Sequence, residues 1–248
     1  MRSRMALLLA CLALAVSAWA GDPWKEKTYK EWDEKEVNKI LADSPWSHPV
    51  TVIAFWRSGG GSMPTAGGRS GGAGEASEGA AAAGQGASGA GGAGGGGGIP
   101  EAHFTVRWGS ARTTREALAR LDILRGMSET VAEKLINLPV TEHQIVLYGS
   151  DMAPFAKSDE KSLMEKTSLK LKKNKQRISP LRVEIKKSQD GKKITGIVFY
   201  FPMKSETGEP VIAPDEKGVE FECRTDAVSI RQIFEPQKMI SKAGPDLR

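Results

Sequence analysis

Alternation of apolar and polar residues predicts β-strands through much of the chain. The clearest case is LRVEIKK, residues 181–187, in which every second residue is apolar. The turn SQDGKK follows, and its Asp190-Gly191 pair supplies the positive backbone φ that a tight hairpin needs before the apolar run ITGIVFYF. Further short runs of this kind lie at 103–108, 143–150, 219–223 and 228–234. The pattern predicts about six or seven strands, most of them joined by hairpins.

Helical spacing of apolar residues predicts helices at about 34–42 and 113–125, a shorter segment after Ser128, and a third helix at 159–167. The first two begin with capping-box spacing, Asp33 with Glu36 and Thr113 with Glu116. Strands joined by hairpins, with the helices grouped between them, are typical of the α+β class. We therefore expect a mainly antiparallel sheet with two or three helices.

A Gly/Ala-rich tract at residues 59–98 separates two strand-like runs, PVTVIAFWR and HFTVRW. The first run is apolar on both alternating faces, which favours a central strand. The tract has almost no apolar side chains to offset chain entropy, so it is predicted to be a long disordered loop. Lengthening a hairpin loop from about four to about forty residues costs only roughly 2 kcal/mol. Pairing of the two runs is therefore favoured over a linker between separate domains.

The first twenty residues have the layout of a secretory signal peptide. Arg2 and Arg4 precede an apolar run, and Ala18-Trp19-Ala20 is a small-x-small cleavage site. An alternative is a lipobox at Leu8-Leu9-Ala10-Cys11, which would anchor the protein through a lipid on Cys11. The rest of the chain contains no apolar stretch long enough to span a membrane. We expect an exported protein, periplasmic or extracellular.

These patterns predict the organisation of the whole chain. We expect a signal peptide at 1–20, an N-terminal helix and first strand at 21–58, the loop at 59–98, the remainder of the same α+β domain at 99–240, and a flexible tail at 241–248.

Candidate catalytic and metal-binding residues do not form a recognisable set. The three histidines, His48, His103 and His143, lack metal-ligand spacing. Ser158 and Lys161 match the S-x-x-K motif of penicillin-binding enzymes, but its companion motifs are missing. No metal site and no cofactor is therefore predicted.

Two further groups have structural explanations. Cys223 alternates with apolar residues in a predicted strand, which indicates a buried thiol without a disulfide partner once Cys11 is removed. The acidic residues Asp215, Glu216, Glu220 and Glu222 are explained by a solvated strand edge and turn.

Charge is unevenly distributed. The chain has a formal net charge of +5, yet residues 157–193 hold thirteen Lys and Arg against five Asp and Glu. This segment could bind a polyanion through Lys170, Lys172, Lys173, Lys175 and Arg177, or its cations could protect exposed strand edges. It lacks aromatic residues for stacking on bases, which argues against nucleic acid.

Tryptophan is concentrated near the N-terminus. Trp24, Trp32 and Trp46 surround the first predicted helix. They either dock this helix onto the body of the domain or form an exposed contact surface for a partner.

The opening YKEWDEKEVNKILADSPW, the following VTVIAFWR, the Gly-rich tract and FTVRWGSARTTREALARL resemble a group of uncharacterised exported bacterial proteins. The opening is also similar to the start of the Gly-Trp-x-Thr-Asp domain proteins, although that motif is missing here. The resemblance implies export and a bacterial source. The signal peptide, the aromatic N-terminal segment, the predicted disordered loop and the lack of a catalytic set together predict a non-enzymatic periplasmic or envelope protein that binds a macromolecular partner. Two alternatives are a polyanion-binding protein using 157–193 and a hydrolase whose site is not visible in the sequence.

Overall fold

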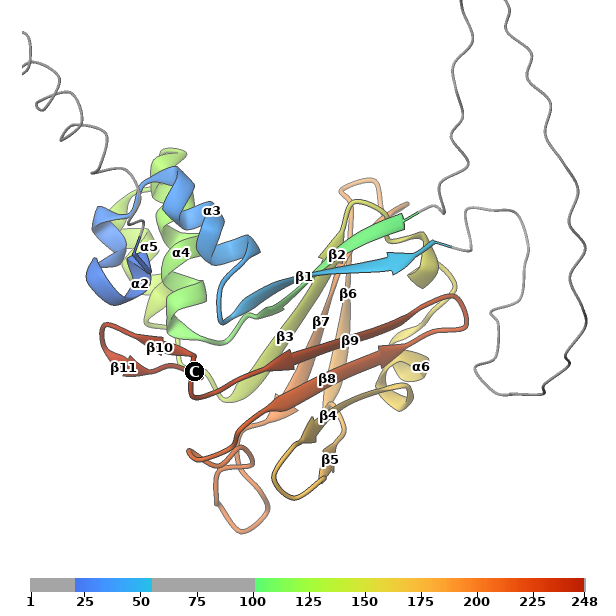
Figure 1. Cartoon of the computed structure of the whole chain (residues 1–248). Coiled ribbons are helices and arrows are strands. Elements are labelled where there is room, and N and C mark those ends of the chain that lie inside the picture. Colours follow the sequence, from blue (N-terminus) through green and yellow to red (C-terminus); the bar gives the residue numbers. More distant parts are fainter. Residues whose placement is uncertain (1–20, 55–100, 248) are drawn as a thin grey trace, which may run out of the picture.

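The computed structural model describes residues 21–54 and 101–247 (Figure 1). The predicted signal peptide, the alternative acylation site at Cys11 and the predicted disordered loop at 59–98 lie outside these residues. The helices are α2 (Pro23–Glu26), α3 (Glu34–Ala42), α4 (Arg112–Leu124), α5 (Glu129–Ile136) and α6 (Glu160–Glu165), with the 3-10 helices η1 (Tyr29–Glu31) and η3 (Ala153–Phe155).

The strands pair antiparallel throughout, which confirms the predicted α+β class. One sheet has the order β1-β2-β3-β7-β6, and the other has the order β5-β4-β8-β9. The strands of the first sheet are β1 (Ser47–Ile53), β2 (Glu101–Trp108), β3 (Glu142–Gly149), β6 (Arg182–Lys187) and β7 (Ile194–Pro202). Those of the second are β4 (Thr167–Leu171), β5 (Arg177–Ile178), β8 (Val219–Arg224) and β9 (Ser229–Phe234).

The hydrophobic core lies between the two sheets. Phe199 of the first sheet and Phe221 of the second have ring centroids 5.3 Å apart, and Trp108 and Phe234 meet at 5.2 Å. All four rings are buried. The strands expected in one sheet therefore form two sheets that bury their apolar faces against each other.

The predicted pairing of the strands on either side of the Gly/Ala-rich tract is confirmed. β1 and β2 are antiparallel neighbours, with Val50 opposite Phe104. The expectation that the first of them is a central strand is wrong, because β1 lies at the edge of its sheet. Val50 and Val52 pack on the core, whereas Ile53 on the other face is 43% exposed.

The helices other than α6 and η3 gather at one end of the sheets (Figure 1). We call α2, η1, α3, α4 and α5 the helical lobe. The predicted capping box of α3 is confirmed, because the Glu36 N–H donates to Asp33 Oδ1 at 2.8 Å and the Asp33 N–H donates to Glu36 Oε2 at 3.0 Å. The Arg120 side chain of α4 donates to the Trp32 carbonyl, which fixes the N-terminal segment to α4.

The expected flexible tail is instead part of the fold. β10 (Ile240–Ser241) and β11 (Gly244–Pro245) form a small hairpin that returns the chain to the helical lobe. The Trp46 indole donates to the Asp246 carbonyl at 2.7 Å, and the Trp108 indole donates to the Leu247 carbonyl at 2.9 Å. We call Trp46, Trp108, Asp246 and Leu247 the C-terminal junction.

Asp246 also supplies the N-terminal cap of α4. Its buried carboxylate accepts hydrogen bonds from the N–H groups of Arg112 and Thr113, both at 2.7 Å. The predicted capping box of Thr113 and Glu116 is therefore wrong. The unpaired N–H groups of a helix start can be satisfied by a side chain from any part of the sequence, so a cap can come from the far end of the chain.

Candidate functional site

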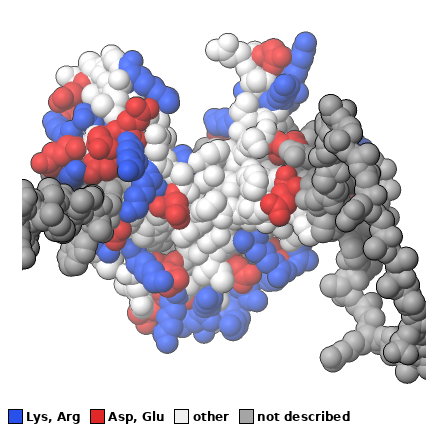
Figure 2. Space-filling model, turned by 45° about the horizontal axis from the view of Figure 1, so that its top comes forward, with Lys and Arg blue, Asp and Glu red and all other residues white. Residues whose placement is uncertain are grey.

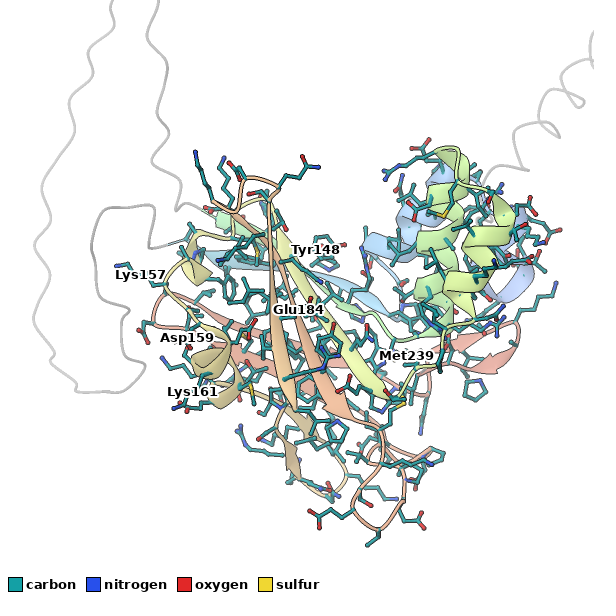
Figure 3. The ribbon with its side chains drawn as sticks, turned by 180° about the vertical axis from the view of Figure 1, so that it is seen from behind. Tyr148, Lys157, Asp159, Lys161, Glu184 and Met239 are labelled. Carbon is teal, nitrogen blue, oxygen red and sulfur yellow. The ribbon has the colours of Figure 1, made fainter. Side chains whose placement is uncertain are left out.

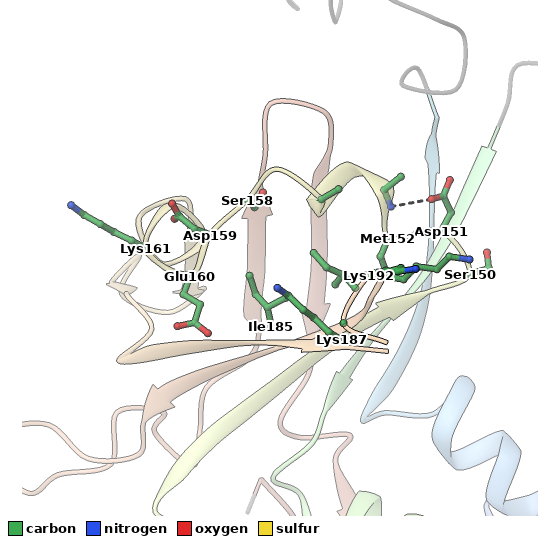
Figure 4. Close-up of a pocket in the computed structure, with 15 residues that line it drawn as sticks. Ser150, Asp151, Met152, Ser158, Asp159, Glu160, Lys161, Ile185, Lys187 and Lys192 are labelled. Atoms are coloured by element: carbon green, nitrogen blue, oxygen red, sulfur yellow. Dashed lines mark hydrogen bonds between the residues drawn. The ribbon is translucent and has the colours of Figure 1, made fainter. Parts of the chain in front are cut away.

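A cleft of about 1090 Å³ lies between residues 150–161 and the hairpin of β6 and β7 (Figure 4). Figure 3 shows that Asp159 and Lys161, on one of its walls, are at the end of the molecule away from the helical lobe. Aliphatic parts of the lining come from Met152, Ala153, Ala156, Ile185 and Ile194, and its cations are Lys161, Lys187, Lys192 and Lys193. We call this site the lysine cleft.

The β6–β7 hairpin sets the positions of three of these lysines. Gly191 adopts the positive φ of 70° that the Asp190-Gly191 pair predicts, and Asp190 Oδ1 accepts the Lys192 N–H at 3.1 Å. The pairing register also shifts between Lys186 and Lys187. The turn therefore places Lys187, Lys192 and Lys193 on one wall of the cleft.

The opposite wall is the segment that leads into α6. Asp159 caps this helix, with Oδ1 accepting the Ser162 N–H at 2.7 Å. That hydrogen bond holds the pKa of Asp159 below its ordinary value. Asp151 Oδ1 accepts the Ala153 N–H at 3.0 Å and so shapes the turn before η3. Asp151 and Asp159 thus have structural partners of their own, and Glu160 is the third carboxylate on this wall.

The lysines of the cleft differ from most cations nearby, because they form no ion pair with any residue in 21–54 or 101–247. Lys186, the neighbour of Lys187, is bound to Glu184 at 2.5 Å. The hairpin wall contributes no acidic residue to the lining. The four lysines of the lining exceed its three carboxylates by one, and the positive charge is concentrated on the hairpin wall. A local excess of positive charge attracts anions.

No aromatic side chain is found among the described residues that line the cleft. A base or a sugar ring would therefore have no flat surface on which to stack. Aliphatic side chains beside ammonium groups instead suit a ligand with both aliphatic groups and negative charge.

Ser158 and Lys161 of the S-x-x-K match both line the cleft. In Figure 4, however, the Lys161 side chain extends away from Ser158. Lys161 is also exposed to solvent. A serine nucleophile needs a base within hydrogen-bond reach, so this geometry does not support a catalytic pair.

The histidines lie at three separate places. The His48 ring is 5.3 Å from Phe234, and burial lowers the pKa of His48. His103 Nδ1 is 3.0 Å from the Thr51 hydroxyl, and the buried His143 is 3.3 Å from the Leu247 carbonyl. In the part of the chain that the structure describes, no group of three or more His, Cys, Asp or Glu residues is placed to hold a metal ion.

Cys223 is the buried thiol that its strand pattern predicts. It is inaccessible to solvent, and burial raises its pKa to about 12. A thiol that stays protonated is a poor nucleophile.

The predicted partner surface at Trp24, Trp32 and Trp46 is wrong, because all three side chains are buried, at 3%, 1% and 0% exposure. The Trp24 and Trp46 rings pack edge to face at 5.7 Å. The alternative explanation, that the tryptophans dock the first helix, agrees with this packing.

The predicted anion-binding residues lie on β4, β5 and the turn between them, and none lines the cleft. Lys173 is paired with Asp215, and Arg177 with Glu222. Lys170 lies opposite Arg177 in the strand register, while Lys172 and Lys175 are exposed. The structure thus divides the basic segment between the cleft and the second sheet.

Two of the acidic residues expected at a solvated edge are buried. Glu216 is 1% exposed and accepts the N–H groups of Lys173, Lys217 and Gly218, so it organises a loop. Glu222 is 7% exposed and is held by arginines.

The sequence analysis did not single out Lys187, Lys192 and Lys193, although all three lie in the basic segment. A signal was present, since two of these lysines directly follow the predicted Asp190-Gly191 turn and the third precedes it. Side chains on the two sides of a tight hairpin turn come close together.

Comparison with protein-family models, curated proteins and solved structures finds no match for this chain. None of the described helices is long and apolar enough to cross a membrane.

Proposed function

We propose that this protein is an exported, non-enzymatic binding protein that holds an acidic segment of a macromolecular partner in the lysine cleft. The observation that carries the proposal is the set of four cleft lysines without an ion pair among the described residues, set beside an aliphatic lining. Elsewhere in the basic segment, five cations have acidic partners: Lys166, Lys173, Arg177, Arg182 and Lys186. The other cations of the segment that form no ion pair with a described residue, Lys157, Lys170, Lys172 and Lys175, do not line the cleft.

The mixed chemistry of the lining favours a peptide segment as ligand. An extended acidic segment with aliphatic side chains would place carboxylates against the hairpin lysines and bury its apolar groups on Met152, Ile185 and Ile194. The volume of about 1090 Å³ accommodates several amino-acid residues.

Export is supported by the sequence pattern of the first twenty residues, with two arginines, an apolar run and a small-x-small site. A binding role rather than a catalytic one is supported by the positions of the candidate nucleophiles. Cys223 is buried, and Lys161 extends away from Ser158 (Figure 4).

A peptide-binding assay tests the proposal. We would measure the affinity of a fluorescent peptide of alternating glutamate and leucine by anisotropy, and compare it with a peptide carrying lysine in place of glutamate. The acidic peptide is expected to bind, with an affinity that falls as salt rises. Substituting Lys187→Gln, Lys192→Gln and Lys193→Gln together should weaken binding by roughly threefold to a hundredfold, since each exposed charge pair contributes about 0.2–1 kcal/mol.

The matched control carries Lys35→Gln, Lys134→Gln and Lys204→Gln, which remove the same charge from exposed lysines outside the cleft. This variant should bind the acidic peptide within about twofold of the unaltered protein. Equal weakening in both variants would show that only net charge matters, and the proposed site would be rejected.

A further inference from the structure

Three arginines of the second sheet converge on a single carboxylate, that of Glu222. Arg231 Nη2 is 2.7 Å from Glu222 Oε1, and Arg224 Nε donates to the same oxygen at 2.8 Å. Arg177 Nη1 approaches Oε2 at 3.3 Å and also donates to the Ser168 hydroxyl at 3.2 Å. We call Arg177, Arg224, Arg231 and Glu222 the arginine cluster.

The strand register explains why these side chains meet. Glu222 of β8 lies opposite Ser168 of β4 and Arg231 of β9. Arg224 is two residues from Glu222 on the same strand, so both point to the same face. β5 brings Arg177 in from the sheet edge beyond β4. No helix covers this face of the second sheet in Figure 1.

The cluster has an excess of positive charge. Burial alone would raise the pKa of Glu222, but the hydrogen bonds from Arg224 and Arg231 outweigh it and hold the pKa below its ordinary value. Glu222 is therefore ionised at neutral pH, and it compensates one of three guanidinium charges. Figure 2 shows Lys and Arg gathered along the lower part of the molecule.

Neighbouring charged residues do not remove the excess positive charge of the arginine cluster. Lys166 is paired with Asp226, and Lys170 lies opposite Glu220 in the register. Each of these positive charges thus has an acidic group beside it, and none of the three arginines gains a second carboxylate within the described residues.

The arginines also keep donors that point to no described residue. A guanidinium has five N–H donors. Arg224 and Arg231 bind Glu222 through Nε and Nη2, so their Nη1 groups are left without a described acceptor. The three side chains are 59%, 53% and 56% exposed, whereas that of Glu222 is 9% exposed. The buried carboxylate therefore binds the guanidinium groups on the side that faces the protein. Their unbound N–H groups face solvent.

We propose that the arginine cluster binds a tetrahedral oxyanion, a phosphate or sulfate group, with Glu222 as a positioning residue beneath it. Guanidinium groups match the oxygen spacing of such groups and bind them through paired hydrogen bonds. The oxyanion would balance the charge that Glu222 leaves uncompensated. This inference is independent of the lysine cleft and its ligand.

Titration with inorganic phosphate and with inorganic sulfate tests it. We would follow the Arg Nε–Hε resonances by NMR at constant ionic strength, using chloride to replace the added anion. Saturable shifts at Arg224 and Arg231 are expected with at least one of the two anions. The variant Arg231→Gln should weaken this binding at least fivefold, and the matched control Arg182→Gln, an exposed arginine paired with Glu142, should leave it unchanged.

The variant Glu222→Gln separates a binding role from a purely structural one. Removing the internal carboxylate charge should increase phosphate or sulfate affinity severalfold, because the anion then meets three uncompensated arginines. The titration of the unaltered protein remains decisive if this variant does not fold. Absence of saturable shifts with both anions, or equal weakening by Arg231→Gln and Arg182→Gln, would overturn the proposal.

Discussion

The C-terminal junction and the lysine cleft use their polar groups in opposite ways. At the junction the indole N–H groups of Trp46 and Trp108 and the carboxylate of Asp246 all have partners inside the protein. In the cleft the ammonium groups of the lysines have no acidic partner among the described residues and face an open volume. The junction therefore contributes stability, and the cleft is available for binding.

This contrast shows why residue type alone is a poor guide to function. Tryptophan is enriched at protein interfaces, and lysine is depleted there. Here the tryptophans within the described residues are buried, and lysines form the candidate site. What distinguishes the two regions is whether each polar group already has a partner within the fold.

The largest expected effect on stability comes from the cap of α4. Asp246→Ala leaves the Arg112 and Thr113 N–H groups without their acceptor and should lower the free energy of unfolding by about 2–4 kcal/mol. Urea denaturation followed by circular dichroism measures this. The control Asp226→Ala, whose side chain is 97% exposed, should change it by less than about 0.5 kcal/mol. A similar loss in both variants would contradict the role of the junction.

A smaller effect is expected for Trp46→Phe. The change removes the indole N–H that donates to the Asp246 carbonyl and leaves a small void. It should destabilise the protein by about 1–3 kcal/mol, measured by the same denaturation assay. If Trp46 served as a partner contact instead, the variant would keep its stability.

Glu222 gives a pH-dependent prediction. Its folded-state pKa is lowered, so its contribution to stability is present above about pH 4.3, the ordinary glutamate pKa, and is lost as pH falls through the folded pKa. Glu222→Gln should cost about 1–2 kcal/mol at pH 7, and the difference from the unaltered protein should shrink in acid. Thermal unfolding from pH 7 to pH 3 measures this. A constant difference across that range would rule out the ion pairs as its cause.

The smallest effect on stability is expected in the cleft. The combined variant Lys187→Gln, Lys192→Gln, Lys193→Gln should change the free energy of unfolding by no more than about 0.5 kcal/mol, because these lysines form no ion pair in the described structure. Denaturation of this variant beside Asp246→Ala tests the contrast directly. A loss above about 2 kcal/mol would show that the lysines are structural.

Local patterns predicted the local structure well. The capping box of α3 and the positive φ at Gly191 are both present, because each depends on residues within a few positions of one another. The cap of α4 could not be predicted, since Asp246 reaches Thr113 only after the chain has folded. The position of β1 at a sheet edge also depends on the order of all the strands.

The candidate site was predicted only in part. Segment 157–193 contains the cleft lysines, but sequence could not separate them from Lys173 and Arg177. Those two have acidic partners, Asp215 of a turn and Glu222 of β8, which are distant from them in the sequence. Which cations are uncompensated is a property of the folded structure.

The most direct test of the account is a map of the surface that the acidic peptide contacts. Backbone amide shifts would be recorded by NMR as the glutamate–leucine peptide is added. The account predicts that the shifts concentrate at residues 150–161 and at the β6–β7 hairpin, and that they follow one binding curve. Shifts centred on the second sheet or the helical lobe, or no saturable shift at all, would contradict it.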